Sequence, residues 1–348
     1  MEKHSKPDFT GQTIYIGLDM HKDSWSVSIH SEHLEHKTFT QPPEASKLVN
    51  YLHRNFPGAT YQAVYEAGFC GFWPHEQLQQ HGINCIVVNP ADVPTSNKEK
   101  RRKKDKVDCR KLAKRLRSHE LKAIHVPTRA QMEDRGLVRT RQSMVRKQTR
   151  CKNQIISILL LYGISVPDMP RWSGRFIKEL QQIPMHTASG DTCLQMHLEE
   201  LVYLRGRIAA LNRAILNLSR SQQYRHNMRL LRTVPGISTI TAMTLLTELI
   251  DIHRFKSFDH LCGYVGLVPD TASSGDKENI IGLTSRQNKL LRSMLVQSAW
   301  VAVRRDPALM LRFNHLSMRM KKTKAIVRIA RKLLNRVRFV LKSQQCYE

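Results

Sequence analysis

Hydrophobic side chains in the first third of the chain follow the short period of strands, interrupted by the longer period of helices. Residues 13–20 and 83–90 are short β-rich apolar runs, and residues 24–30 alternate apolar and polar positions with period two. The expected strands are residues 13–20, 24–30, 33–40, 60–68 and 83–90, and the expected helices are residues 42–56, 73–82 and 106–116. Strands that alternate with helices predict an α/β domain with a mixed sheet.

The middle third has no strand pattern and predicts long helices. Residues 131–162 contain no proline, and a second apolar pattern runs through residues 198–220. There the side chains step by three and four positions, at Leu201, Leu204, Ile208, Leu211, Ile215 and Leu218. That spacing is the seam of a coiled coil. We favour self-association through these helices, and the alternative is a helical hairpin packed within one chain.

The last third predicts a mainly helical domain that opens with two helices joined by a glycine turn. Pro235 and Gly236 form this turn, and Ser238 or Thr239 can cap the helix that follows. A glycine turn at a helix start exposes backbone N–H groups that bind phosphate, so Gly236 is a candidate contact in a helix-hairpin-helix type of element. The basic amphipathic tail, residues 318–342, suits nucleic acid or a partner helix better than a membrane surface.

The charge balance indicates a polyanionic partner. The 348 residues include 56 Lys and Arg against 29 Asp and Glu, which gives a formal charge of +27. Such an excess repels itself in the folded state, and nucleic acid is the usual polyanion that relieves the repulsion.

Other features bear on where the protein works. No segment reaches the ~18 uncharged apolar residues that span a bilayer, and residues 1–12 lack the apolar core of a signal peptide. The seven cysteines are scattered, without a CxxC pair, which argues against a structural zinc site and a disulfide framework. We therefore expect a reduced, cytoplasmic protein with no membrane partner.

Four carboxylates stand where an α/β fold can bring them together. Asp19 and Glu66 end predicted strands, while Asp105 and Asp108 open a predicted helix and share one of its faces. Mg²⁺ prefers such carboxylates together with substrate phosphates, and a pair of ions can stabilise both oxygens of an in-line phosphoryl transfer. Taken singly, each acid could be only a cap or turn residue. Together the four predict an Mg²⁺ site, in which Mn²⁺ can substitute.

Basic residues surround the last two acids. Lys103, Lys104 and Arg110 belong to a run of cations that would hold a phosphate backbone next to the ion. The alternative is local ion pairing on a solvated face.

Several segments resemble a known family. "YIGLDMHKDSWSVSI", "VYEAG" and "KKDKVDCRKLA" resemble the RuvC-like, RNase H-fold domain of the DEDD transposases of the insertion-sequence 110 family, with its 1111 subgroup. "TVPGISTITAMTLLTEL", "LCGYVGLVP" and "LTSRQNKLLRSMLVQSAWVAVRRDPAL" resemble that family's C-terminal transposase domain. The resemblance implies a RuvC-like domain over residues 1–128, a coiled-coil dimerisation region over residues 129–222 and a C-terminal transposase domain over residues 223–348.

The resemblance also implies roles for single residues. The family's metal-binding acids fall on Asp19, Glu66, Asp105 and Asp108. Its serine nucleophile falls on Ser274, with Ser273 as the neighbouring alternative. Independently of the resemblance, basic residues at helical spacing could either clamp phosphates or form a solvated basic face: Arg286, Lys289 and Arg292.

The function that the resemblance implies is RNA-guided DNA recombination in a bacterial or archaeal cell, at the nucleoid. A noncoding bridge RNA would pair with donor and target DNA, and a homodimer would assemble into a tetramer on DNA. Cleavage would pass through a covalent phosphoserine. The alternative is a metal-dependent nuclease of RNase H type, such as a junction resolvase, which needs the acids but no serine. A third interpretation is a non-catalytic nucleic-acid-packaging protein.

Overall fold

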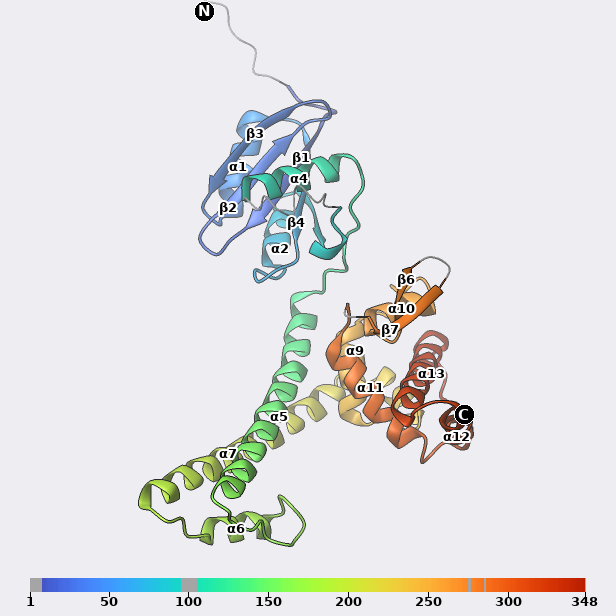
Figure 1. Ribbon diagram of the computed structural model, residues 1–348. Helices are drawn as coiled ribbons and strands as arrows, with labels where there is room; N and C mark the ends of the chain where they lie inside the picture. Colours follow the sequence, from blue (N-terminus) through green and yellow to red (C-terminus); the bar gives the residue numbers. More distant parts are fainter. Residues whose placement is uncertain (1–7, 95–104, 275–276, 285, 348) are drawn as a thin grey trace, which may run out of the picture. The chain divides into compact units, whose positions relative to one another are not determined.

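The chain folds into two compact units, residues 1–126 and residues 127–348. The computed structural model (Figure 1) describes residues 8–94, 105–274, 277–284 and 286–347. The predicted phosphate contacts Lys103 and Lys104 lie outside the described residues. The second unit contains both the helical middle segment and the C-terminal segment, so the expected boundary at residue 222 stays a prediction.

A mixed sheet forms the centre of the first unit. Its strands are β1 (Thr13–Met20), β2 (Trp25–His30), β3 (Glu35–Gln41), β4 (Thr60–Glu66) and β5 (Asn84–Val88), arranged in the order β3-β2-β1-β4-β5. β1, β2 and β3 are antiparallel neighbours, whereas β1, β4 and β5 run parallel. The α/β interpretation of this segment is thereby confirmed.

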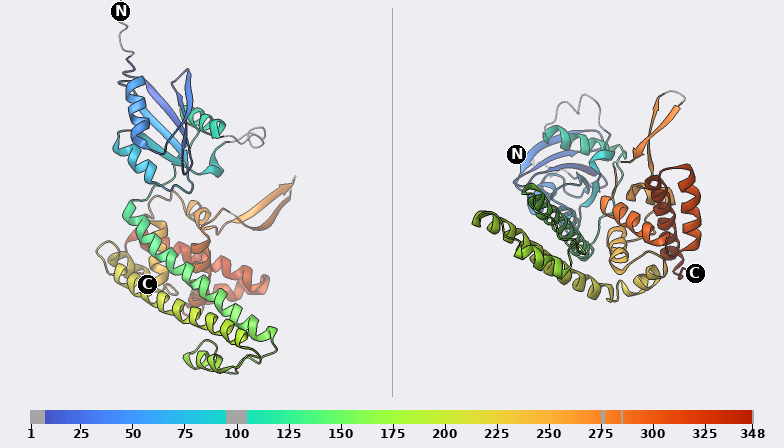
Figure 2. Two further views of the ribbon diagram at one scale, coloured as in Figure 1. Left: turned by 90° about the vertical axis from the view of Figure 1, so that its left-hand side faces the viewer. Right: turned by 60° about the horizontal axis from the view of Figure 1, so that its bottom comes forward.

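Helices cover both faces of this sheet. α1 (Ala45–Asn55) and α2 (Trp73–Gln80) pack on one face, and α4 (Asp105–Arg117) packs on the other (Figure 2, left). A short 3-10 turn, η1 (Pro90–Asp92), follows β5. Alternate residues of β1 therefore enter different cores, with Ile16 and Leu18 facing α1 and α2 while Tyr15 faces α4.

The second unit begins with a pair of long helices joined through a short one. These are α5 (Arg129–Leu161), α6 (Gly174–Gln182) and α7 (Ala188–Ser219). α5 and α7 run antiparallel, since Arg141 bonds Asn212 and Cys151, further along α5, bonds His197, earlier in α7. α5 begins at a capping box in which the Thr128 hydroxyl accepts from the N–H of Gln131.

The predicted leucine seam is buried within one chain. Leu201, Leu204 and Ile208 are buried on α7, and α5 packs along α7. The seam is therefore covered by a helix of the same chain, as in the alternative of a helical hairpin packed within one chain. Because α5 of the same chain already supplies the partner surface, self-association remains a prediction that must rest on other surfaces.

The C-terminal part of this unit is mainly helical, as predicted. It consists of α8 (Arg225–Thr233), α9 (Thr239–Leu249), α10 (Phe258–Val265), β6 (Pro269–Ser274), β7 (Lys277–Leu283), α11 (Lys289–Ala302), α12 (Pro307–Arg319) and α13 (Lys322–Ser343). The β6–β7 hairpin was not expected from the sequence. α13, the basic tail, buries its apolar face in the core with residues such as Ile329, Leu333 and Val337. The apolar face of α13 therefore packs within the protein's own core and does not offer a surface for a partner helix.

No helix among the described residues combines the length and apolarity needed to cross a membrane.

The core of the C-terminal helices also includes Val138 of α5 and Ile215 of α7. The beginning of α5 and the end of α7 are therefore packed into that core.

Candidate active site

Asp19 and Glu66 end neighbouring parallel strands on the same face of the sheet. Leu18 pairs with Tyr65 across β1 and β4, so the next residues along, Asp19 and Glu66, stand side by side. Side chains alternate along a strand, and Tyr15 of β1 and Val64 of β4 both face α4. Asp19 is four residues after Tyr15, and Glu66 is two residues after Val64. Both acids therefore lie on the face of the sheet that α4 covers.

The first turn of α4 brings two more carboxylates to this place. Asp105 and Asp108 both lie in that turn. The Nε2 atom of His21 lies 3.3 Å from Oδ2 of Asp19 and 3.5 Å from Oδ2 of Asp105, so one imidazole touches acids from β1 and α4. The charge of Asp108 also acts on Asp19. The structure thus joins Asp19, Asp105 and Asp108 by described interactions and places Glu66 on the same face at the next strand end.

Gly17 sets the distance between α4 and the sheet. A Cβ at this position would lie 2.0 Å from the carbonyl oxygen of Cys109 and 2.5 Å from the backbone nitrogen of Ala113. Both atoms belong to the backbone of α4 and cannot rotate away. The glycine therefore lets the helix lie directly on β1, two residues before Asp19, and this contact brings the acids of α4 to the strand end.

Gly17→Ala is expected to destabilise the first unit by about 3 kcal/mol, the upper part of the usual range for overpacking. It should weaken divalent-cation binding at the acids as well, because the helix must move outward. Chemical denaturation followed by circular dichroism measures the first effect. Gly136→Ala is the control, since Gly136 lies in α5 with no atom within 4 Å of the new Cβ. It should gain about 0.5–1 kcal/mol from helix propensity. Equal stabilities for Gly17→Ala and the wild type would contradict the packing argument.

The electrostatics of the acid cluster favour a bound cation. Burial raises the pKa of Asp19 above its ordinary value, the nearby carboxylates of Asp105 and Asp108 raise it further, and His21 opposes them. Like charges held this close are costly unless a positive charge lies between them. Carboxylate oxygens are the ligands that Mg²⁺ and Mn²⁺ prefer. The donor set therefore fits a divalent cation on its chemistry.

Two residues of this cluster were missed by sequence reasoning. His21 follows Asp19 by two positions, so it could have been noticed as a same-face neighbour at the strand end. The Lys111 side chain is only 9% exposed, and its Nζ lies 3.3 Å from Oδ1 of Asp108. The predicted local ion pairing therefore occurs at Asp108, beside the acid cluster.

Arg110 lies one residue before Lys111 on α4 and contacts β3. Its Nε lies 2.8 Å from Oε1 of Glu35 and donates to the Thr38 hydroxyl at 3.0 Å. A role for Arg110 in phosphate binding therefore requires exchange of these partners, and it stays a prediction.

Ser274 is the last residue of β6, in the second unit. By register, Ser274 pairs with Lys277 and Ser273 with Glu278, so both candidate nucleophiles stand at the end of the hairpin. The segments that precede β6 and follow β7 contact each other at the base of the hairpin. Gly266, in a left-handed conformation at the end of α10, packs so closely on Gln287 that a Cβ would lie 2.3 Å from the Gln287 Cβ.

A buried carboxylate ties this base to α5. Glu248 on α9 is fully buried and accepts two hydrogen bonds from Arg139, at 2.7 and 2.9 Å. Its Oε2 also accepts from the side-chain amide of Asn288 at 2.7 Å. Asn288 is the N-cap of α11 and donates its backbone N–H to Tyr264. One carboxylate therefore fixes α5, α9 and the start of α11 together.

Arg139→Ala is expected to cost about 3 kcal/mol of stability in the second unit, because it leaves a buried charge without its main partner. Thermal or urea unfolding would measure it. Arg146→Ala, at an exposed position on the same helix, should stay within about 0.5 kcal/mol of the wild type. If the two substitutions cost the same, the buried carboxylate is satisfied without Arg139.

The remaining predicted contacts lie around α9 and α11. Gly236 has a positive φ of 89°, and a Cβ there would lie 2.5 Å from the carbonyl oxygen of Ser298. The turn therefore packs against α11, which gives the glycine a structural role besides the predicted phosphate contact. Arg286 and Lys289 are exposed, and Arg292 is partly buried. Their contacts with nucleic acid stay predictions.

Comparison with known proteins agrees with this fold. Residues 16–164 match the model of the transposase family DEDD_Tnp_IS110, and residues 228–314 match the model described as transposase IS116/IS110/IS902 family. The first match contains all four acids, and the second contains Ser274. The mixed sheet with its helices is thus the RNase H-like DEDD domain of that family.

Curated relatives span most of the chain. The transposase for insertion sequence element IS1328 of Yersinia enterocolitica is 30% identical over 83% of this chain and 84% of its own length. The putative transposase y4rJ of Sinorhizobium fredii is 28% identical over 92% of this chain and 90% of its own length. The putative transposase y4qE of the same organism is 31% identical, and the match spans 68% of this chain and 57% of that protein. The chain therefore belongs to the IS110 family of transposases, enzymes that cut and transfer DNA strands and whose DEDD domain requires a divalent metal.

Proposed function

We propose that this transposase is an RNA-guided DNA recombinase that cleaves and rejoins donor and target DNA through a phosphoserine at Ser274. The observation that carries the catalytic half of the proposal is the meeting of Asp19, Asp105 and Asp108 at the end of β1, with Glu66 on the same face. A hydrolytic nuclease would use the same acids, so Ser274 is what separates the two functions.

Asp19, Glu66, Asp105 and Asp108 are proposed to hold Mg²⁺, with Mn²⁺ as a substitute. When bound, such a cation would draw charge from the phosphoryl oxygens of the scissile phosphate. The chain's own part is to fix the donors: Gly17 allows the approach of α4, and Lys111 balances Asp108. Arg286, Lys289 and Arg292 would position the DNA backbone by charge-assisted contacts.

The serine step balances without a co-reactant. The Ser274 hydroxyl oxygen forms a bond to phosphorus, and the bond from phosphorus to one sugar oxygen breaks. The serine hydroxyl loses a proton and the leaving sugar oxygen gains one, so the phosphodiester count is unchanged and rejoining needs no external energy source. A serine hydroxyl is a weak nucleophile at neutral pH and needs activation. The acids belong to the first unit and Ser274 to the second, and the proposed reaction requires groups from both.

RNA guidance is proposed from the family resemblance of the sequence alone, while the cations of α5 offer a surface for nucleic acid. After Asp134, α5 carries no acidic residue but seven cations: Arg135, Arg139, Arg141, Arg146, Lys147, Arg150 and Lys152. Several of them are exposed, as Arg146, Lys147 and Arg150 are. The exposed cations of this helix suit a phosphate backbone, whereas Arg139 and Arg141 are held by Glu248 and Asn212. We propose that α5 contacts the guide RNA and that a homodimer assembles into a tetramer on DNA.

The test of function is adduct mapping. Full-length protein is incubated with Mg²⁺, both DNAs and RNA from the flanks of the element, and any amino acid linked to a cut end is identified by mass spectrometry. We expect a DNA phosphate on Ser274. Cleavage with no protein–DNA adduct would favour the nuclease instead, and binding without cleavage would favour the packaging protein.

Guidance is tested separately by co-purification. We expect one discrete RNA species encoded beside the gene, bound with an affinity that falls steeply with salt. Heterogeneous cellular RNA alone would count against a guide. Light scattering that shows a monomer with and without nucleic acid would overturn the proposed assembly.

A further inference from the structure

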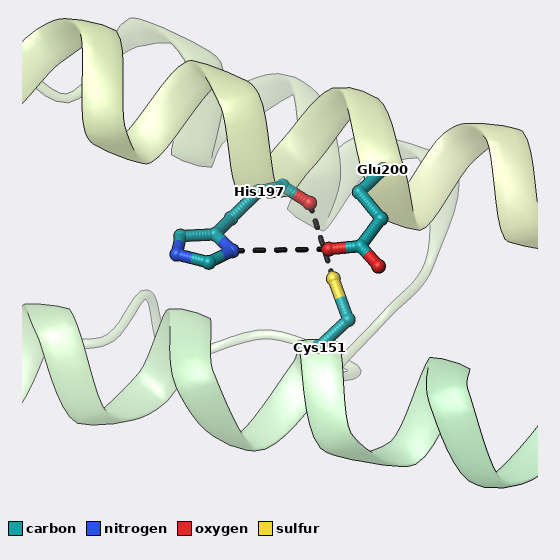
Figure 3. A group of neighbouring side chains, drawn as sticks. All are labelled: Cys151, His197 and Glu200. Atoms are coloured by element: carbon teal, nitrogen blue, oxygen red, sulfur yellow. Dashed lines mark hydrogen bonds and ion pairs between the residues drawn. The ribbon is translucent and has the colours of Figure 1, made fainter.

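A cysteine, a histidine and a glutamate meet between α5 and α7, and none of them is among the proposed catalytic residues. Figure 3 shows Cys151 reaching from α5 towards α7, where His197 and Glu200 stand side by side. The Cys151 thiol donates to the carbonyl oxygen of His197 at 3.2 Å, and the Nδ1 atom of His197 lies 4.0 Å from Oε2 of Glu200. One ligand atom from each residue lies within 4.8 Å of the other two.

The helical geometry explains why these side chains converge. His197 and Glu200 are three residues apart on α7, so they occupy one face of that helix. Cys151 is 1% exposed and belongs to the apolar core that includes Ile155 and Leu198. The His197 and Glu200 side chains are 29% and 49% exposed. The sulfur therefore approaches from the core and the other two donors from the solvent edge.

The donor set differs in kind from that of the acid cluster. A sulfur, an imidazole nitrogen and one carboxylate oxygen suit Zn²⁺ and its borderline-soft neighbours, whereas Mg²⁺ prefers oxygen alone. Tetrahedral zinc with bonds of about 2.0–2.3 Å holds its ligand atoms roughly 3.3–3.8 Å apart. Ligand atoms within 4.8 Å reach that spacing through a shift of about 1 Å, which partly exposed His and Glu side chains can make.

We propose that Cys151, His197 and Glu200 form a zinc site that ties α5 to α7, with water as a fourth ligand. Binding replaces the thiol proton, which passes to solvent, and replaces the hydrogen bond to the His197 carbonyl with a sulfur–metal bond. No electron transfer is involved. The tie links residues 46 positions apart in sequence and fixes the register of the two helices near α6.

Without an ion, the thiol stays protonated. Burial and the Glu200 carboxylate raise the pKa of Cys151 to about 11. A buried cysteine with a weak hydrogen bond would need neither His197 nor Glu200 nearby. The presence of both on the facing helix, at the level of the sulfur, is what points to a cation.

The test is a Co²⁺ titration of full-length protein that has no polyhistidine tag and has been stripped of metal with a chelator. We expect one equivalent of Co²⁺ to produce thiolate-to-cobalt charge-transfer absorption, and Zn²⁺ to remove that absorption by displacement. Cys151→Ser should abolish the band. His197→Ala and Glu200→Gln should weaken Co²⁺ binding at least about tenfold, as the loss of a supporting group at such sites already does.

Matched controls locate the site. Cys193→Ser changes an exposed cysteine on α7 and should leave the band intact, as should Asp19→Asn, which affects only the acid cluster. Far-ultraviolet circular dichroism establishes that each variant is folded. If Cys151→Ser misfolds, Glu200→Gln, at a partly exposed position, carries the test. No thiolate band in the wild type, or an unchanged band in Glu200→Gln and Cys151→Ser, would overturn the proposal.

Discussion

Ser274→Ala is expected to eliminate the covalent protein–DNA adduct and to lower strand exchange at least about 10³-fold, the scale seen when a nucleophile that acts as part of a unit is removed. The change deletes one hydroxyl at the end of β6. Binding of RNA and DNA should therefore be unchanged, because it rests on many phosphate contacts. Adduct formation on a denaturing gel and strand exchange on defined substrates measure the two effects.

Ser273→Ala is the matched control for this experiment. The two serines are adjacent in the same strand, so their substitution perturbs the hairpin similarly. We expect Ser273→Ala to retain the adduct. The opposite pattern would move the nucleophile to Ser273, and adduct formation in both variants would exclude a role for either serine as nucleophile.

Asp19→Asn is expected to abolish DNA cleavage and adduct formation in Mg²⁺, because it removes the carboxylate charge that interacts with His21, Asp105 and Asp108. The loss should be at least about 10³-fold, as for other groups that act as a unit. Asp105→Asn should behave alike. Asp8→Asn, which changes an exposed acid that accepts from Thr10 before β1 begins, is the control and should cleave normally. Normal Mg²⁺-dependent cleavage by both Asp19→Asn and Asp105→Asn would contradict the account.

The stability of Asp19→Asn separates this effect from misfolding. Since the pKa of Asp19 is raised in the folded protein, the native state binds this proton more tightly than the unfolded state. Stability of the metal-free protein therefore falls as pH rises from the ordinary aspartate pKa through the raised one. Asn cannot ionise and avoids that loss, so the metal-free variant should unfold at the same temperature as the wild type or a higher one at neutral pH.

Local patterns in the sequence predicted the strands and helices of the first unit, but they did not predict how α4 completes the acid cluster. Apolar runs and period-two alternation predicted the strands, and the positions of Asp19 and Glu66 at strand ends predicted their meeting. The contact of His21 with Asp105 depends instead on α4 returning to β1 across more than 80 residues, at the depth that Gly17 allows. A long-range approach of this kind leaves no periodic signal.

The second unit shows two further limits. A seam such as that of Leu201 and Leu204 predicts helix packing, but spacing alone does not say whether the partner helix belongs to the same chain. β6 is polar and β7 lacks period-two alternation, so neither strand was predicted from the sequence. Ser274 was accordingly indicated by family resemblance and not by physical pattern.

Manganese binding tests the central claim most directly, because it reads the carboxylates without requiring DNA chemistry. Electron paramagnetic resonance of free Mn²⁺ is followed as full-length protein is added, with the wild type compared with Asp19→Asn, Glu66→Gln and Asp105→Asn. We predict saturable Mn²⁺ binding by the wild type, competed by Mg²⁺ and strongly weakened in each variant. Binding that is equal in all four proteins would contradict a shared cation at the end of β1.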